Sequence, residues 1–168
     1  MTKNKDLILG IDPGLNITGW GLIEKKGNFD NYLAHGFIKT DKKKELGFRL
    51  NTIYEKLLEI TKKYSPSSIA IEKIFSNKNP ESTLKLGMSR AIVFLIAARE
   101  SSEIFEYSPN TVKKNLVGYG HADKNQIINM IKRVFPNINI DNEDSADALA
   151  VAICHSMQMQ SKIRVFSK

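Results

Sequence analysis

The sequence is short of cysteine and of long apolar runs. Its 168 residues include one cysteine, Cys154, so an intramolecular disulfide and a cysteine-rich zinc site are both excluded. The longest apolar run, 91–98, falls far below the roughly 18 residues that a membrane-spanning helix needs. The first residues also lack the apolar stretch and cleavage site of a secretory signal. We therefore expect a cytoplasmic protein that does not bind membranes.

Acidic residues are outnumbered by basic ones. The chain has 25 lysines and arginines against 18 aspartates and glutamates, a formal net charge of +7. This excess suits a polyanionic partner such as a nucleic acid. The fractions of hydrophobic and charged residues, 42% and 26%, are typical of a globular protein, and the length is typical of one domain. We expect a single domain over residues 1–168, with an ordered core from about 6 to 159.

The order of the predicted elements indicates an α/β fold. Three strands joined by short turns come first and predict an antiparallel meander. Strands and helices then alternate, which predicts parallel crossovers. The result is a mixed five-stranded sheet with three antiparallel N-terminal strands, flanked by helices. The predicted strands are 6–12, 17–25, 31–39, 68–72 and 104–107, and the predicted helices are 46–64, 84–99, 109–116, 123–134 and 144–159, with a polar loop over 75–83.

Four acidic residues lie where three predicted elements begin or end. Asp12 closes the first strand and Glu72 the fourth, while Asp144 and Asp147 share one face at the start of the last helix. If the two strands are parallel neighbours, both carboxylates lie at the same sheet edge. Carboxylates held close repel one another unless a cation compensates them, and hard oxygen ligands suit Mg²⁺ or Mn²⁺. Two such ions can promote hydrolysis of a phosphodiester.

Simpler explanations exist for single acids. An aspartate before Pro13-Gly14 is common turn chemistry. Acids at a helix start interact favourably with the helix dipole, and this is the preferred explanation for Asp141 and Glu143. Two other functions also stay open: a binding module with an inactive site, and an ATPase-type fold. The latter requires a second glycine-rich phosphate loop, which the sequence does not show.

Four segments closely resemble the RuvC family of Holliday-junction resolvases. The resemblance spans about residues 6–157 and keeps the family's order. It implies an RNase H-like fold and a homodimer that resolves four-way DNA junctions by paired symmetric nicks, leaving 5′-phosphates, in recombination and repair. It also implies a RuvA–RuvB branch-migration partner. The segments are GIDPGLNITGWG at 10–21, AIEKIFSNKNPESTLKLGMSR at 70–90, NTVKKNLVGYGHADKNQI at 110–127 and DSADALAVAICH at 144–155.

The resemblance also assigns roles to residues. It implies two Mg²⁺ ions per active site, for which Mn²⁺ can substitute, and basic side chains near the cut phosphate. An aromatic side chain in the polar loop, Phe75, is expected to stack on unpaired bases, with Lys78 beside it. The catalytic carboxylates are then Asp12, Glu72, Asp144 and Asp147, and the basic residues near the cut phosphate are Lys113 and the catalytic Lys124. Lys114 is a further candidate for DNA contact.

The stretch 107–140 is the most one-sided in charge. It contains four lysines and one arginine, and Asp123 is its only acid. Such residues can supply sequence-independent phosphate contacts, although scattered lysines are more often simply solvated. The basic residues are Lys113, Lys114, Lys124, Lys132 and Arg133.

Two further patterns concern packing. Gly19 and Gly21 alternate along the second strand and indicate either the close approach of another backbone or a bulge. The helix over 84–99 is apolar nearly all round between 91 and 98, so it must lie in the core or at a subunit contact. The resemblance favours a dimer contact made by Leu86, Arg90 and Phe94.

Overall fold

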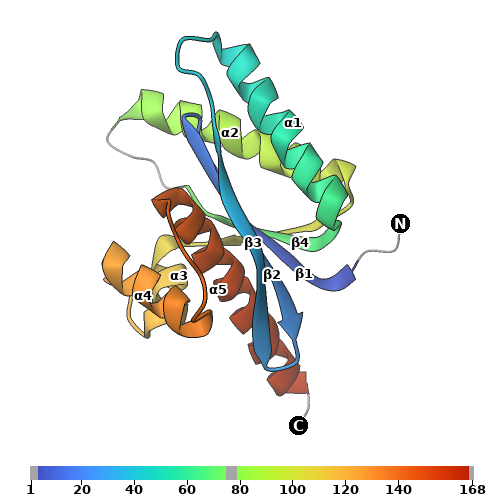
Figure 1. Ribbon diagram of the computed structural model, residues 1–168, viewed down its shortest axis with the longest axis vertical. Coiled ribbons are helices and arrows are strands. Elements are labelled where there is room, and N and C mark those ends of the chain that lie inside the picture. Colours follow the sequence, from blue (N-terminus) through green and yellow to red (C-terminus); the bar gives the residue numbers. More distant parts are fainter. Residues whose placement is uncertain (1–3, 75–78, 167–168) are drawn as a thin grey trace.

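Five strands form one mixed sheet, as the sequence predicts (Figure 1). The computed structural model describes residues 4–74 and 79–166. The strands follow the order β3-β2-β1-β4-β5 across the sheet; β2 pairs antiparallel with β1 and β3, and β4 pairs parallel with β1 and β5. Their bounds are β1 Asn4–Asp12, β2 Ile17–Lys26, β3 Phe29–Lys39, β4 Pro66–Glu72 and β5 Glu103–Tyr107.

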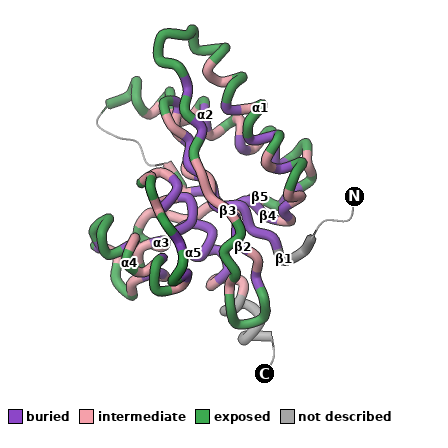
Figure 2. Tube along the Cα trace, in the orientation of Figure 1, coloured by how far each residue is buried: buried purple, intermediate pink, exposed green. Residues whose placement is uncertain are grey.

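Helices cover both faces of the sheet. On one face α1 (Leu46–Tyr64) and α2 (Pro80–Arg99) pack over the side chains of Ile11 and Ile71. On the other face α5 (Glu143–Phe166) crosses the sheet, with α3 (Pro109–Val117) and α4 (Lys124–Val134) packed against it. Alternate residues of the central strands enter the two separate cores, as the period of two in a strand requires. Figure 2 shows the buried residues concentrated in these strands and in α5.

The helix α5 lies unusually close to β1 and β2 because glycines face it. A Cβ atom at Gly10 would lie 1.9 Å from the Ala148 carbonyl oxygen, and one at Gly19 would lie 2.0 Å from the Asp144 carbonyl oxygen. A Cβ atom at Gly21 would meet the Leu149 side chain at 2.6 Å. The glycines of β2 therefore mark the approach of another backbone, which decides between the two explanations that the sequence left open.

The start of α2 differs from the prediction. The helix begins at Pro80, within the predicted loop, and Asn79 caps it by accepting hydrogen bonds from the Glu81 and Ser82 N–H groups at 3.1 and 3.3 Å. The first turn is polar, so apolar periodicity could not reveal it. Asn at the N-cap followed by Pro at the first helical position was the available signal.

The apolar helix α2 is buried on one side only. Val93 and Ile96 are fully buried against the sheet, whereas Leu84 and Leu95 expose 64% and 57% of their surfaces. The exposed positions Leu84, Met88, Ala91, Leu95 and Ala98 alternate by four and three residues, and so form one continuous stripe along the helix.

Within the described residues, none of the helices has the length and apolar character that crossing a membrane requires.

Candidate active site

Two of the predicted carboxylates lie side by side at one edge of the sheet. In the parallel register of β1 and β4, Ile11 pairs with Ile71. Asp12 and Glu72 each come directly after one residue of this pair, so they lie beside each other at the ends of the two strands. Both isoleucines face the α1–α2 side and are fully buried. Because side chains alternate along a strand, the next residues, Asp12 and Glu72, point toward the α5 side. A hollow of about 190 Å³ is lined by both carboxylates together with Lys73, Leu86 and other residues.

The first turns of α5 bring the other two carboxylates to this edge. The contact between Gly19 and the Asp144 backbone fixes where the helix starts relative to β2. Asp144 and Asp147 lie one turn apart and are half-buried. Their charges reach Asp12, because each of them raises the pKa of the Asp12 carboxyl.

The cluster resists ionisation in the absence of a cation. Burial, followed by the charges of Asp147, Asp144 and Glu72, raises the pKa of Asp12 from its ordinary value of 3.8 to about 7. Burial is also the main cause that raises the pKa values of Glu72 and Asp147. Carboxyl groups that oppose each other's ionisation in this way form the environment that a bound cation stabilises.

Lys124 lies beside the cluster, at the start of α4. Its Nζ atom donates a hydrogen bond to Glu143 Oε2 at 2.7 Å and lies 4.0 Å from Asp147 Oδ2. The bond to Glu143 is the main cause that raises the pKa of Lys124, so this side chain carries its positive charge. The sequence interpretation of Glu143 as a helix-start acid missed this contact. The helix is capped by Asn142, whose Oδ1 accepts the Ser145 N–H at 3.1 Å.

The two adjacent lysines of α3 differ in their relation to the site. Burial raises the pKa values of Glu72 and Asp147, and the positive charge of Lys113 opposes part of this rise. This lysine therefore lies near the cluster. Lys113 is half-buried, whereas Lys114 is exposed. Successive helical residues point about 100° apart, since a turn contains 3.6 residues, and this explains why only one of them faces the carboxylates.

Two of the predicted dimer residues lie close to this site instead of on the exposed stripe of α2. Leu86 lines the hollow with Asp12 and Glu72. Arg90 donates to the Glu72 carbonyl oxygen at 2.6 Å, and its other terminal nitrogen lies 2.7 Å from Glu106 Oε2. The third, Phe94, is half-buried and packs against the core under α1 and α2. Arg90 therefore holds the end of β4, a role that the sequence pattern did not suggest.

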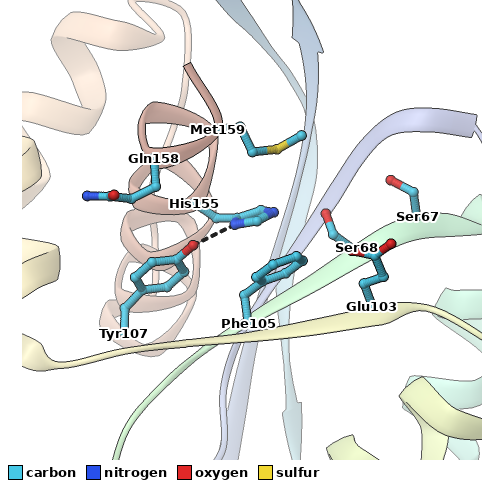
Figure 3. Close-up of a pocket in the computed structure, with 8 residues that line it drawn as sticks. All are labelled: Ser67, Ser68, Glu103, Phe105, Tyr107, His155, Gln158 and Met159. Carbon is cyan, nitrogen blue, oxygen red and sulfur yellow. Dashed lines mark hydrogen bonds between the residues drawn. The ribbon is translucent and has the colours of Figure 1, made fainter. Parts of the chain in front are cut away.

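The histidine of α5 does not join the cluster. His155 is buried and accepts or donates a 2.7 Å hydrogen bond with the Tyr107 hydroxyl, while its ring stacks on Phe105 at 4.1 Å (Figure 3). It is therefore a packed histidine that lies away from the carboxylates. Phe75 and Lys78 lie outside the described residues.

The donor set fits a hard divalent cation. Among the described residues, no three His, Cys, Asp or Glu side chains already converge on one point as direct ligation of an ion requires. The cluster nevertheless offers only carboxylate oxygens, which Mg²⁺ and similar ions prefer, and these ions commonly keep water and substrate phosphate in their coordination sphere. Asp12, Glu72, Asp144 and Asp147 are thus the residues that fit such an ion.

Known proteins match both the sequence and the fold. The family model described as crossover junction endodeoxyribonuclease RuvC matches residues 8–155. The chain belongs to the RuvC family. The RuvC proteins of Bartonella bacilliformis and of Wolbachia sp. subsp. Brugia malayi are 45% and 48% identical to it, over 89% and 88% of this chain and 89% and 92% of theirs. Dependence on a divalent metal ion is a property of this nuclease family.

Solved RuvC structures share the fold of this RuvC-family chain. Thermus thermophilus RuvC in complex with a Holliday junction substrate superimposes with a TM-score of 0.88, at 27% identity, over 94% of this chain and 96% of that one. The yeast mitochondrial resolvase Ydc2 superimposes with a TM-score of 0.69 at 13% identity, a likeness of fold alone. The RNase H-like architecture that the resemblance implied is therefore confirmed.

The raised pKa of Asp12 predicts how the metal-free protein responds to pH. Between pH 3.8 and about 7, Asp12 keeps its proton in the folded state and loses it in the unfolded state. This group therefore lowers the free energy of unfolding as pH rises through that range. We expect Asp12→Asn to stabilise the protein in EDTA by on the order of 2–4 kcal/mol at pH 8. Little difference from wild type is expected at pH 4. Urea unfolding at the two pH values measures this gain.

A matched control for this measurement is Glu55→Gln, which removes an exposed carboxylate on α1. It should leave the free energy of unfolding nearly unchanged at both pH values. An Asp12→Asn protein less stable than wild type at pH 8 in EDTA contradicts the electrostatic description of the site.

The two lysines of α3 give a second prediction. Lys113→Gln should lower the rate of DNA cleavage about 100-fold, because a positive charge beside Glu72 and Asp147 is lost. Lys114→Gln removes the same charge one residue away and should lower the rate less than about fivefold, as expected for an exposed lysine. Single-turnover cleavage of a labelled substrate compares them. Equal losses of cleavage rate in the two variants would contradict the finding that Lys113 faces the carboxylates and Lys114 does not.

Proposed function

We propose that the protein is a structure-selective endodeoxyribonuclease that resolves four-way (Holliday) DNA junctions by paired symmetric nicks, in homologous recombination and DNA repair. The observation that carries this function is the convergence of Asp12, Glu72 and the Asp144–Asp147 pair, flanked by Lys124, at one edge of the sheet. Membership in the RuvC family, and the fold shared with a RuvC protein solved on a Holliday junction, support the substrate.

The carboxylates provide the binding site for the ions. We propose that Asp12, Glu72, Asp144 and Asp147 hold two Mg²⁺ ions, for which Mn²⁺ can substitute. When bound, such ions activate water and stabilise the leaving oxygen of a phosphodiester. The burial and mutual repulsion of the carboxylates, seen in the raised pKa of Asp12, make the site bind cations and, once filled, accept the negatively charged phosphate.

The lysines complement the charge of the reacting phosphate. Lys124 stays protonated because of Glu143 and Asp147, and lies where it can donate to a phosphate oxygen. Lys113 approaches from α3 on the side of Glu72. In the reaction a water oxygen bonds to phosphorus while the bond from phosphorus to the 3′ oxygen breaks. The attacking water gives up a proton and the departing 3′ oxygen takes one up, so the products are a 5′-phosphate and a 3′-hydroxyl.

A four-way junction is approximately two-fold symmetric, so two nicks require two active sites related by the same symmetry. An isologous homodimer supplies them. We propose that the exposed stripe Leu84, Met88, Ala91, Leu95 and Ala98 of α2 forms the dimer contact. Its spacing of four and three residues is that of helices that pack along an apolar seam. The proposed dimer contact therefore differs from the one expected from the resemblance, because Arg90 and Phe94 lie on the inward side of α2.

We also retain two expectations from the family resemblance. A RuvA–RuvB branch-migration complex is the proposed partner on the junction. The relatives are bacterial proteins, whose chromosomal DNA lies in the cytoplasm, and we place the protein there. The alternative of a binding module with an inactive site is less favoured, because all four carboxylates are present and Asp12 is electrostatically coupled to the other three.

The decisive test compares binding with cutting. Wild-type protein should nick a synthetic four-way junction in Mg²⁺ and leave a linear duplex of the same sequence uncut. Asp12→Asn should bind the junction within about threefold of wild type and cut it at least 1,000-fold more slowly, because one ion loses its ligand while the DNA-binding surface is unchanged. Gel-shift and single-turnover assays measure the two quantities.

Each alternative predicts a different result in this test. An inactive binding module binds the junction without nicking it in Mg²⁺ or Mn²⁺. Full cleavage activity of Asp12→Asn in Mg²⁺ refutes the assignment of the carboxylates. Wild-type protein incubated with EDTA serves as the control for metal-independent contaminating nucleases.

The dimer contact gives another prediction. Leu95→Glu places a charge in the middle of the exposed stripe and should convert the dimer to a monomer in sedimentation velocity at micromolar concentration. The control is Leu33→Glu on β3, where a leucine exposes 42% of its surface away from α2. It should leave the sedimentation coefficient unchanged. A Leu95→Glu protein that sediments like wild type places the contact elsewhere.

A further inference from the structure

The strand beside Glu72 has no N–H group to offer to the Glu72 carbonyl oxygen. Lys73 donates its N–H to the Tyr107 carbonyl oxygen at 2.7 Å, so the backbone groups of Lys73 point toward β5. Consecutive residues of a strand direct these groups to opposite neighbours, and the Glu72 carbonyl therefore points toward β1. Continued by one residue, the register of β1 and β4 places the nitrogen of Pro13 opposite this carbonyl, and proline carries no N–H. Pro13 also lines the hollow with Glu72.

Arg90 of α2 supplies the donor that β1 lacks. One terminal nitrogen of its guanidinium donates to the Glu72 carbonyl oxygen at 2.6 Å, and the other lies 2.7 Å from Glu106 Oε2 on β5. The planar guanidinium presents its N–H groups in a fixed fork, which suits two partners at once. The Arg90 side chain is 14% exposed and lies over the Phe94 ring at 5.1 Å, so packing restricts it as well. A side chain from a helix thus takes the place of a backbone hydrogen bond within the sheet.

This contact holds the residue that carries one carboxylate of the site. Glu72 is the last residue of β4, so the chain leaves the strand directly after it. A part-buried carbonyl group without a donor is costly, and a strand end that loses its donor turns until the carbonyl finds another one. The Cα atom and the carboxylate of Glu72 move with that turn. A site for Mg²⁺ tolerates little movement, because this ion demands near-ideal octahedral geometry.

We propose that Arg90 is a positioning residue for the cation site. By taking the place of the missing strand N–H, it fixes the end of β4 and thereby the Glu72 carboxylate. It acts through Glu72 and is not itself a ligand, since a guanidinium has no lone pair to offer to a cation. The inference rests on the proposed function, because it takes Glu72 as a ligand of the ions, but it requires no DNA.

The direction of the effect separates positioning from simple charge. Arg90 is a cation, and its loss also leaves the Glu106 carboxylate without this partner. By Coulomb's law, removing positive charge and uncovering negative charge near Glu72 strengthens the binding of a cation there. Loss of positioning has the opposite effect and weakens it. The two explanations therefore predict changes of metal affinity in opposite directions.

The first measurement is the binding of Mn²⁺ to the DNA-free protein, followed by electron paramagnetic resonance of the free ion. Arg90→Met removes every donor of the side chain and should weaken Mn²⁺ binding about 10-fold, as is typical for residues that orient metal ligands. The control is Arg99→Gln on the same helix, where Arg99 donates to the Tyr54 hydroxyl at 2.8 Å, and it should leave the affinity unchanged. Circular dichroism verifies that both variants are folded.

A second variant carries the test if Arg90→Met does not fold. Arg90→Lys keeps the positive charge but loses the planar fork that reaches the Glu72 carbonyl and Glu106 together. It should weaken Mn²⁺ binding about threefold, less than Arg90→Met because one contact can still form. Since the charge is unchanged, this loss reflects geometry alone.

A double-mutant cycle tests whether Arg90 acts through Glu72. Glu72→Gln already removes the carboxylate, so adding Arg90→Met should weaken Mn²⁺ binding by less than about twofold in that background. In the Asp144→Asn background, which keeps Glu72, the loss of about 10-fold should remain. A general loss of structure would instead lower the affinity equally in both backgrounds. Arg90→Lys replaces Arg90→Met in the cycle if the latter does not fold, with the threefold loss confined to the Asp144→Asn background in the same way.

The outcomes separate this inference from the proposed function. The inference is overturned if the folded Arg90 variant binds Mn²⁺ as tightly as wild type or more tightly, or if it loses the same affinity in both backgrounds. In both cases cleavage of the junction by wild-type protein leaves the proposed function standing. If wild-type protein binds no Mn²⁺ and cuts no junction, the proposed function fails first and the role of Arg90 with it.

Discussion

The close seating of α5 on the glycines of β1 and β2 is the constraint on which the site depends. The Ala148 and Asp144 carbonyl oxygens occupy the space that side chains at Gly10 and Gly19 would fill. Only the Hα atoms of these glycines separate the sheet from the backbone of α5 there. The first turns of α5 therefore reach the edge where β1 and β4 end. A larger residue at either position would lift the helix and move Asp144 and Asp147 away from Asp12.

This arrangement concentrates negative charge in the centre of a basic protein. The carboxylates are held together by packing, against their own repulsion, as the raised pKa of Asp12 records. Around them lie Lys113 and Lys124. The same protein surface therefore offers a cation site at its centre and anion contacts at its margin, the combination that a phosphodiester substrate requires.

The helices on the opposite face of the sheet are connected to the site by the side chain of Arg90. Arg90 extends from α2 to the Glu72 carbonyl oxygen and to Glu106 on β5. The helix that carries the exposed apolar stripe is therefore bonded directly to the strand that carries Glu72. In a dimer formed through that stripe, the two helices at the interface would each hold the end of one β4, so the geometry of the interface and of the active sites would be set together.

The sequence alone determined the elements and the candidate acids. Period-two and helical patterns predicted the five strands and five helices, and strand-terminal Asp12 and Glu72 followed from the order of the elements. Element ends were less accurate where local patterns were polar, as in the first turn of α2. The resemblance to RuvC assigned Lys113 and Lys124, which no spacing rule distinguishes from Lys114 or Lys132.

Only the tertiary structure decided which of these residues meet. Sequence spacing cannot show that Lys113 faces the carboxylates while Lys114 does not, that Glu143 bonds to Lys124, or that Arg90 turns inward to Glu72. Those contacts depend on the rotation and seating of whole helices, which are set by packing between segments far apart in the chain. The glycines were visible in the sequence, but that they admit a helix, and not a bulge, was fixed by what packs against them.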